Sequence, residues 1–241
     1  MLELPDITLV MIETREHDLA LKAIQDCENK VRFGEVLVFT DQIPKFNVLG
    51  RRCVSVPDWP EKIGWSRFLW NDVAPYIKTS HLLVIQWDSW VKDPEMWTAD
   101  FLNYDYIGAP WWYKNGMNVG NGGFSLRSTA LMRYVRKHRD VFPCVNNIDD
   151  DQLCRKYRIE LEGLGFKWAP EDVAANFAFE CVRPDPKSKH FGFHAMFNWP
   201  AVLETDKLVE RIKLAAKSPY IRNGYMWEAL CKHYPAAQLL V

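Results

Sequence analysis

The chain has 241 residues, of which 48% are hydrophobic and 14% aromatic, so it can bury a large core and is not predominantly disordered. Its 30 Lys and Arg residues nearly balance its 31 Asp and Glu residues, and the net charge of -1 creates no overall field that would attract nucleic acid or an anionic membrane. No apolar run approaches the roughly 20 residues of a membrane-spanning helix, and the first residues show no signal-peptide pattern. The six cysteines form no C-x-x-C pair, which argues against a zinc site. We therefore expect a cytoplasmic protein without a transmembrane segment, whose contact with the inner membrane is peripheral at most.

The first part of the chain alternates between short apolar runs rich in β-formers and segments with helical spacing. Strands are predicted at residues 7–12, 35–40, 53–56 and 81–86, and helices at 17–31, where Gly34 marks the stop, and at 66–77, where Ser66 is the expected cap. This alternation is typical of a mostly parallel sheet with helices on its faces. In such sheets, ligands bind at the edge where the strands end.

Residues beyond position 90 are more irregular and mostly helical. Helices are predicted at 128–139, 149–161, 170–181, 205–217 and 223–234, and Ser128 is the expected cap of the first of them. No repeat, low-complexity tract or linker interrupts the sequence. A single domain is therefore predicted.

Two segments in the middle of the chain could bind a phosphorylated ligand. Asp88 follows the most apolar strand, where a carboxylate suits a hard divalent cation that also holds phosphate oxygens, although it could simply cap the next turn. The segment Gly120-Asn121-Gly122-Gly123 would let the backbone approach a bulky ligand closely, although glycine clusters also form tight turns.

Acidic pairs at two predicted helix starts have two interpretations. Glu171 and Asp172 could supply a general base on a rigid helix, but the helix dipole alone also explains acids in a first turn. For Asp149-Asp150-Asp151 the helix dipole is the favoured explanation, over a metal cluster.

Histidines and tryptophans extend the candidate site. His190 and His194 lie in an aromatic segment, where packing in the core is the ordinary role and ligation of Mn²⁺ the functional one. Tryptophan is abundant, with 11 residues, and core packing explains any single one of them. The clustered tryptophans favour a surface on which sugar rings stack, namely Trp87, Trp90, Trp97, Trp111 and Trp112.

Four segments in order, at residues 85–90, 104–111, 119–127 and 170–172, resemble a family of microbial glycosyltransferases formerly known only as a domain of unknown function. The likeness runs from about residue 7 to residue 198. That family is similar to the GT-A fold nucleotide-sugar transferases. The resemblance implies an α/β, GT-A-like (Rossmann-like) domain over 1–241, with a mostly parallel central sheet flanked by helices. Its parts would be a nucleotide-binding half (1–90), an acceptor and catalytic half (91–200) and extra C-terminal helices (201–241).

The resemblance also implies roles for particular residues. GT-A enzymes hold Mn²⁺ or Mg²⁺ on an Asp-x-Asp motif, of which Gln86-Trp87-Asp88 retains only the second acid, and a late histidine, here His194 with His190 in reserve, completes the metal shell. Asp172 would be the catalytic base, and Glu171 would bind hydroxyl groups. The remaining expected contacts to donor or acceptor are Thr14, Arg15, Asp41, Arg67, Gln86, Trp87, Trp111, Trp112, Asn121, Gly122 and Gly123.

The predicted function is an inverting, metal-assisted glycosyltransferase that moves a sugar from a nucleotide-diphosphate donor to a hydroxyl acceptor. A UDP-sugar is favoured over GDP- or dTDP-sugars, and a glycan acceptor over a modified nucleobase in DNA. One alternative is a non-catalytic module that binds nucleotide sugars or glycans. The other is a nucleotidyltransferase, which would normally carry a basic, glycine-rich loop after the first strand, where this chain has Glu13-Thr14-Arg15-Glu16.

Overall fold

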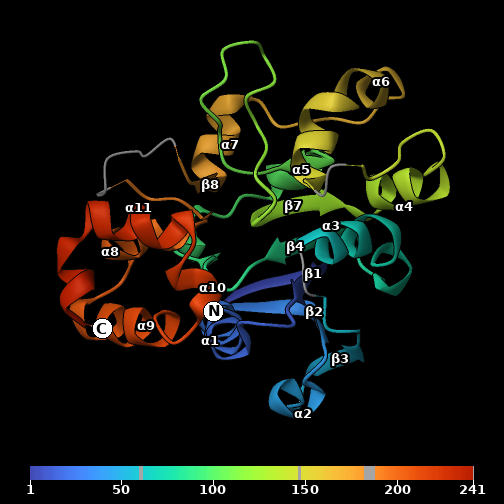
Figure 1. Ribbon diagram of the computed structural model, residues 1–241. Helices are drawn as coiled ribbons and strands as arrows, with labels where there is room; N and C mark the ends of the chain where they lie inside the picture. The colour runs from blue at the N-terminus through green and yellow to red at the C-terminus, as the bar shows by residue number, and fades with distance from the viewer. Residues whose placement is uncertain (60–61, 146–147, 182–187, 241) are drawn as a thin grey trace.

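The computed structural model describes residues 1–59, 62–145, 148–181 and 188–240. A six-stranded sheet forms its centre, with the strand order β3-β2-β1-β4-β7-β6 (Figure 1). The first four strands run parallel, and β7 is antiparallel to both of its neighbours. The bounds of these strands are Leu2–Ile12 (β1), Val31–Thr40 (β2), Arg51–Ser55 (β3), His81–Ile85 (β4), Tyr106–Ile107 (β6) and Phe124–Ser128 (β7).

Alternate residues of the central strands enter two different cores, one on each face of the sheet. In β1, Leu9 and Met11 pack on one face, while Val10 and Ile12 pack on the other. The first face is covered by α1 (His17–Glu28), and the second by α3 (Lys62–Asn71) and α4 (Thr129–Lys137) (Figure 1). The predicted α/β class with a mostly parallel sheet and flanking helices is thereby confirmed.

The remaining elements surround this sheet. A small second sheet has the order β5-β9-β8, formed by Trp90–Val91, Gly192–Phe193 and Ala178–Phe179. The other helices before residue 200 are α2 (Ile43–Phe46), α5 (Asp149–Asp151), the π-helix η4 (Gln152–Lys156), α6 (Arg158–Gly163), α7 (Glu171–Phe177), α8 (Trp199–Val202) and the short 3-10 turns η1 (Ala74–Tyr76), η2 (Pro94–Met96), η3 (Ala99–Asn103) and η5 (Met196–Asn198).

The C-terminal helices lie beside α1 on the first face of the sheet (Figure 1). Two ion pairs join α9 to α1, Arg211 to Asp26 and Glu210 to Lys22, each with 2.5 Å between the charged atoms. The helices are α9 (Thr205–Ala215), α10 (Pro219–Arg222), α11 (Tyr225–His233) and the 3-10 turn η6 (Pro235–Leu240). None of the described helices is long and apolar enough to cross a membrane.

Several predicted boundaries are wrong for identifiable reasons. Gly34 is not a helix stop but lies within β2, where a side chain would come within 2.0 Å of the carbonyl oxygen of Pro5 on the neighbouring strand. Ser66 lies inside α3 rather than capping it, and its hydroxyl donates to a carboxylate on α5. The helix expected over residues 170–181 ends at Phe177 because the chain continues as β8. Ser128, by contrast, caps α4 as predicted, since its hydroxyl oxygen accepts a hydrogen bond from the amide of Leu131.

Candidate active site

A cavity of about 570 Å³ opens at the edge where β1 and β4 end. Its walls come from the turn after β1, from α3, from the segment after β4 and from the glycine-rich loop before β7. The start of α5, the ends of β8 and β9, and the helices α10 and α11 complete it. This is the position at which open α/β sheets bind their ligands.

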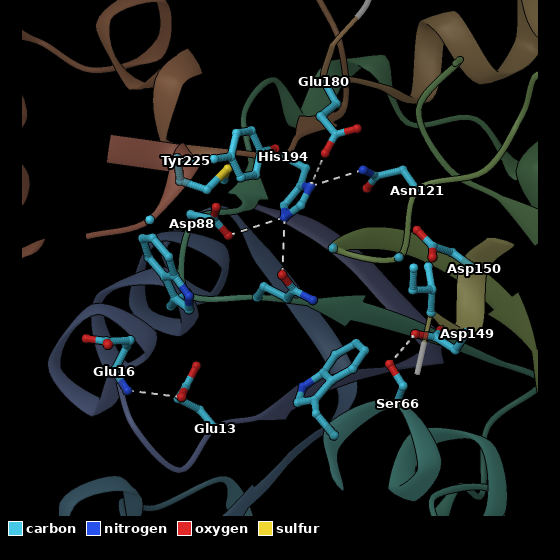
Figure 2. A pocket seen from close by; sticks show the side chains of 18 of the residues that line it. Glu13, Glu16, Ser66, Asp88, Asn121, Asp149, Asp150, Glu180, His194 and Tyr225 are labelled. Atoms are coloured by element: carbon cyan, nitrogen blue, oxygen red, sulfur yellow. Dashed lines mark hydrogen bonds and ion pairs between the residues drawn. The ribbon is translucent and has the colours of Figure 1, made fainter. Parts of the chain in front are cut away.

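His194 lies at the centre of the cavity wall, between two carboxylates (Figure 2). Its Nδ1 is 2.8 Å from Oε1 of Glu180, while its Nε2 is 3.3 Å from Oδ1 of Asp88 and 3.2 Å from Oε1 of Gln86. Burial alone would lower the pKa of His194, but the two carboxylates raise it to about 10. The ring therefore carries a positive charge at neutral pH when no other cation is bound.

Asp88 is almost completely buried, and its two oxygens differ in their contacts. Oδ2 accepts a hydrogen bond from the amide of Met196, whereas Oδ1 accepts none and only approaches His194. The residue between those two partners, Ala195, has a φ of 79°, which is unfavourable for a residue with a side chain. The backbone is thus held in a strained conformation where it brings His194 to Asp88.

The glycine-rich loop lies directly against His194. Asn121 adopts a left-handed conformation with a φ of 67°, its side-chain oxygen accepts from the amide of Phe124, and its Nδ2 lies 3.0 Å from Nδ1 of His194. At Gly123, a Cβ atom would be 2.1 Å from Nε2 of His194. The loop therefore needs glycine because the imidazole occupies the place of a side chain.

Replacing Gly123 with alanine is expected to destabilise the protein by about 1–3 kcal/mol, because the added methyl group must displace the imidazole. Gly122→Ala is the matched control, since its Cβ would meet Cγ of Asp150 at 3.3 Å, a much milder contact. Thermal unfolding of the two variants measures the difference. Equal melting temperatures would show that the loop does not depend on this close approach.

A buried ion pair fixes the start of α5 on the opposite wall. Nη1 of Arg127, a residue of β7, donates to Oδ2 of Asp149 at 2.6 Å, and the hydroxyl of Ser66 donates to the other oxygen of Asp149 at 3.2 Å. Asp150, the next residue, lines the cavity beside Gly122 and has no ion-pair partner among the described residues. Burial, and then repulsion by Asp149, raise the pKa of Asp150 to about 6.

The turn after β1 forms the floor of the cavity around Glu13. Oε1 of this carboxylate accepts hydrogen bonds from the amides of Thr14, Arg15 and Glu16, at 3.0, 2.8 and 3.0 Å. Burial raises the pKa of Glu13, although the hydrogen bonds from the amides of Glu16 and Arg15 act in the opposite direction.

Aromatic side chains form the rim of the cavity. Trp112 and Tyr225 line it with 60% and 62% of their surface exposed. The guanidinium of Arg15 lies over the ring of Tyr220, 4.4 Å from its centre. The rim can therefore offer flat apolar faces to a ligand.

The structure brings most of the predicted contact residues to this one cavity. Besides Asp88 and His194, the predicted residues that line it are Thr14, Arg15, Gln86, Trp87, Trp111, Trp112, Asn121, Gly122 and Gly123. The hypothesis that Trp90 and Trp97 belong to the same surface is wrong, since neither lines the cavity. Trp90 is buried in the core against Phe193, and Trp97 is partly buried and packs on the core at Phe101.

Glu171 and Asp172 are not among the described residues that line the cavity. Both side chains are exposed in the first turn of α7, where Oε2 of Glu171 accepts a hydrogen bond from the side-chain amide of Asn118. The expectation that Asp172 shares a cavity with Asp88 is therefore corrected. Stabilisation of carboxylates by the helix dipole is enough to explain why these two acids stand at the start of α7.

Three further predicted positions also lie away from the cavity lining. Asp41 is held by Nε2 of His17 at 2.6 Å, which keeps the pKa of Asp41 low against the effect of burial. Arg67 is exposed on α3. His190, the reserve metal ligand, is buried in the core, where Nδ1 donates to the carbonyl oxygen of Ala175 at 2.6 Å.

Some residues of the cavity were not predicted as part of a site. Glu13, Asp150 and Glu180 are carboxylates that the sequence presents as a strand end, a helix start and an ordinary acid. A usable signal existed only for Asp150, in a run of three acids that exceeds what a helix start requires. Trp65 and Tyr225 gave no signal beyond their aromatic character.

The family described as "Protein of unknown function (DUF5672)" matches residues 61–194. No curated protein matches the chain. Among solved structures, the chain is similar to the apo form of the glycosyltransferase GlyE of Streptococcus pneumoniae TIGR4, with a TM-score of 0.47 and 9% identity over 83% of this chain and 55% of that one. It is also similar to an active-site mutant of LgtC, with a TM-score of 0.48 and 15% identity over 92% of this chain and 99% of that one. The chain thus spans just over half the length of GlyE.

Proposed function

Because the chain belongs to the family described as "Protein of unknown function (DUF5672)", which names no activity, we propose a function from the cavity itself. We propose that the protein is an inverting glycosyltransferase that uses a nucleotide-diphosphate sugar, UDP-linked by preference, and a glycan hydroxyl as acceptor. The observation that carries this proposal is one cavity with two different acidic centres. Asp88 with His194 lies on one side of it and Asp150 on the other (Figure 2).

The charge of the cavity indicates that a diphosphate would enter together with a cation. Against two cationic side chains, Arg15 and protonated His194, the described lining carries six carboxylates, namely Glu13, Glu16, Asp88, Asp149, Asp150 and Glu180. A diphosphate would be repelled by this surplus unless a bound cation offset it.

Gln86, Asp88 and His194 are the residues that would hold Mn²⁺ or Mg²⁺. Oε1 of Gln86 lies 3.2 Å and Oδ1 of Asp88 3.3 Å from Nε2 of His194. Two atoms that bind the same ion at right angles, each at about 2.1 Å, are about 3 Å apart, so each oxygen is spaced from Nε2 as a second ligand of one ion would be. Among the described residues no group of three His, Cys, Asp or Glu side chains could hold a metal ion, so the proposed site relies on the amide oxygen of Gln86 as its third ligand. Such an ion would supply positive charge to the leaving diphosphate.

Asp150 is the carboxylate best placed to act as the general base. Three of the other acids of the lining are held by ion pairs, Asp149 by Arg127 and both Asp88 and Glu180 by His194. Glu16 accepts from the hydroxyl of Ser218, and one oxygen of Glu13 accepts three backbone amides. Among the described contacts Asp150 accepts only the amide of Asp151, at 2.9 Å, and its raised pKa of about 6 suits a base that works near neutral pH.

The proposed reaction is a single displacement. Asp150 takes the proton of an acceptor hydroxyl, whose oxygen bonds to the anomeric carbon of the donor sugar. The bond between that carbon and the phosphate oxygen breaks, and the nucleoside diphosphate leaves on the side of Asp88 and His194. Attack from the opposite side inverts the anomeric configuration.

The exposed aromatic rim supports a carbohydrate acceptor. Trp112 and Tyr225 offer flat faces on which a sugar ring can stack. The acidic lining disfavours DNA, so a modified nucleobase stays the weaker alternative. The division of the chain into nucleotide-binding, acceptor and C-terminal parts stays a prediction.

The test combines binding with turnover. Addition of UDP and Mn²⁺ together is expected to raise the melting temperature by about 5–10 °C at 100 times Kd, and either alone by much less. UDP release from a panel of UDP-sugars, with simple glycosides as acceptors, then measures transfer. If the protein bound no nucleoside diphosphate, with or without divalent ions, the proposed function would be wrong. Binding without hydrolysis or transfer would identify a non-catalytic module, and diphosphate release from a nucleoside triphosphate a nucleotidyltransferase.

A further inference from the structure

The cavity contains a carboxylate oxygen for which the proposed reaction has no use, on Glu13 at the end of β1. We propose that this oxygen selects the nucleobase of the donor. It accepts a base that presents a ring N–H, as uracil does at N3 and guanine at N1, and rejects cytosine and adenine, whose corresponding ring nitrogen is an acceptor. This inference rests on the proposed function for the presence of a nucleotide, but not on the sugar or the acceptor.

The carboxylate of Glu13 is held in one orientation. Oε1 accepts three backbone hydrogen bonds, from Thr14, Arg15 and Glu16, so the side chain cannot turn over without losing all of them. Oε2 has no hydrogen bond or ion pair among the described contacts, and Figure 2 shows it directed toward the open part of the cavity. Once ionised, Glu13 therefore presents a fixed acceptor to whatever ligand lies there.

Four donors near Glu13 are already engaged. Nε1 of Trp65 donates to the carbonyl oxygen of Ile12 at 2.9 Å, and the three amides of the turn point at Oε1. A ligand atom that meets Oε2 must therefore bring its own hydrogen, because a second acceptor would leave two lone pairs facing each other. The indoles of Trp59 and Trp65 line the same cavity and offer apolar faces to a flat ring.

The position of Glu13 also suits the base end of a nucleotide. β1 and β4 are neighbours, with Met11 opposite Ile85, so the chain leaves the sheet side by side at Glu13 and at the segment that contains Asp88. A diphosphate at Asp88 and His194 then places the attached nucleoside along this edge, toward Glu13.

The first experiment uses the unaltered protein. Calorimetric titration with UDP, GDP, CDP and ADP in the presence of Mn²⁺, at mildly alkaline pH so that Glu13 is ionised, should give at least about tenfold tighter binding of UDP or GDP than of CDP and ADP. UDP methylated at N3 of uracil, which lacks the hydrogen, should bind at least about tenfold more weakly than UDP. The UDP and GDP arms show which of the two N–H bases is taken.

The second experiment is Glu13→Gln. The three backbone hydrogen bonds to Oε1 determine which way the new amide group is oriented. The amide oxygen must take the place of Oε1, because an NH₂ group there would face three N–H donors. The NH₂ group then occupies the place of Oε2 and turns the acceptor into a donor. We expect the preference to invert, with CDP or ADP bound at least about tenfold more tightly relative to UDP than in the unaltered protein.

Glu16→Gln is the matched control, since Glu16 also lines the cavity but its carboxylate accepts from the hydroxyl of Ser218. It should leave the order of the four nucleotides unchanged. Equal binding of all four nucleotides and of N3-methylated UDP would overturn the inference while leaving the proposed function intact. Absence of binding by every nucleotide would instead remove the proposed function.

Discussion

Asp150→Asn is expected to lower kcat for sugar transfer by about 10³-fold, because asparagine cannot take the proton of the acceptor hydroxyl. UDP binding in the presence of Mn²⁺ should be retained, since Asp150 lies on the wall away from Asp88 and His194 (Figure 2). Initial rates of UDP release, together with calorimetric titration of the donor nucleotide, separate the two effects.

The pH profile gives a second reading of the same residue. A base must be ionised, so kcat/KM should rise through pH of about 6 and then level off, and the Asn variant should lack this rise. Folding stability should change in the opposite sense. The raised pKa means that the folded state disfavours the charged form, so the stability associated with Asp150 falls as the pH rises between 3.8 and about 6. At pH 7 the Asn variant should therefore unfold at a higher temperature than the unaltered protein.

Two other acids serve as controls. Asp151 is half exposed and paired with Arg155, with 3.4 Å between the charged atoms, and Asp172 is exposed on α7. Asn at either position should leave kcat within a few fold. If Asp172→Asn were inactive and Asp150→Asn active, the base would be at the position that the sequence indicated and not at the one that the cavity indicates.

The central sheet could be predicted from the sequence because its strands carry local information. Within the run at residues 81–86, the four central positions 82–85 are all apolar, as required by a strand covered on both faces. The turn chemistry of the glycine-rich loop and the acid after the strand then indicated which edge binds the ligand. For this reason Asp88, Asn121, Gly122 and Gly123 lie together as expected.

The choice of base could not be made in the same way, because the two acidic helix starts have the same local explanation. What distinguishes them is a contact between segments far apart in the chain. Arg127 on β7 binds Asp149 and thereby holds the start of α5 at Gly122, whereas the start of α7 remains exposed. The partnership of Glu180 with His194 has the same character, since it depends on β8 pairing with β9.

Asp88→Asn is expected to weaken the Mn²⁺-dependent binding of UDP by at least about 100-fold, if Asp88 contributes an oxygen to the ion. In the unaltered protein the amide of Met196 donates to Oδ2 of Asp88, and the amide oxygen of the variant should take over this bond. The NH₂ group would then take the place of Oδ1 and face Nε2 of His194. The variant thus loses the oxygen that would bind the cation. It also places the N–H donor of an amide beside the imidazole of His194, which already has an N–H donor of its own when protonated. Calorimetric titration of UDP with and without Mn²⁺ measures the loss.

Glu180→Gln separates a metal ligand from a simple charge effect. Glu180 contacts Nδ1 of His194, on the far side of the ring from Asp88, so it cannot share an ion with Nε2. If Asp88 acts as a ligand, Glu180→Gln keeps the dependence on Mn²⁺ while Asp88→Asn loses it, and thermal melting confirms that both variants are folded. The opposite result is that both variants lose UDP binding equally and that Mn²⁺ has no effect on either. The two carboxylates would then act only by keeping His194 protonated, and the imidazolium rather than a metal ion would hold the diphosphate.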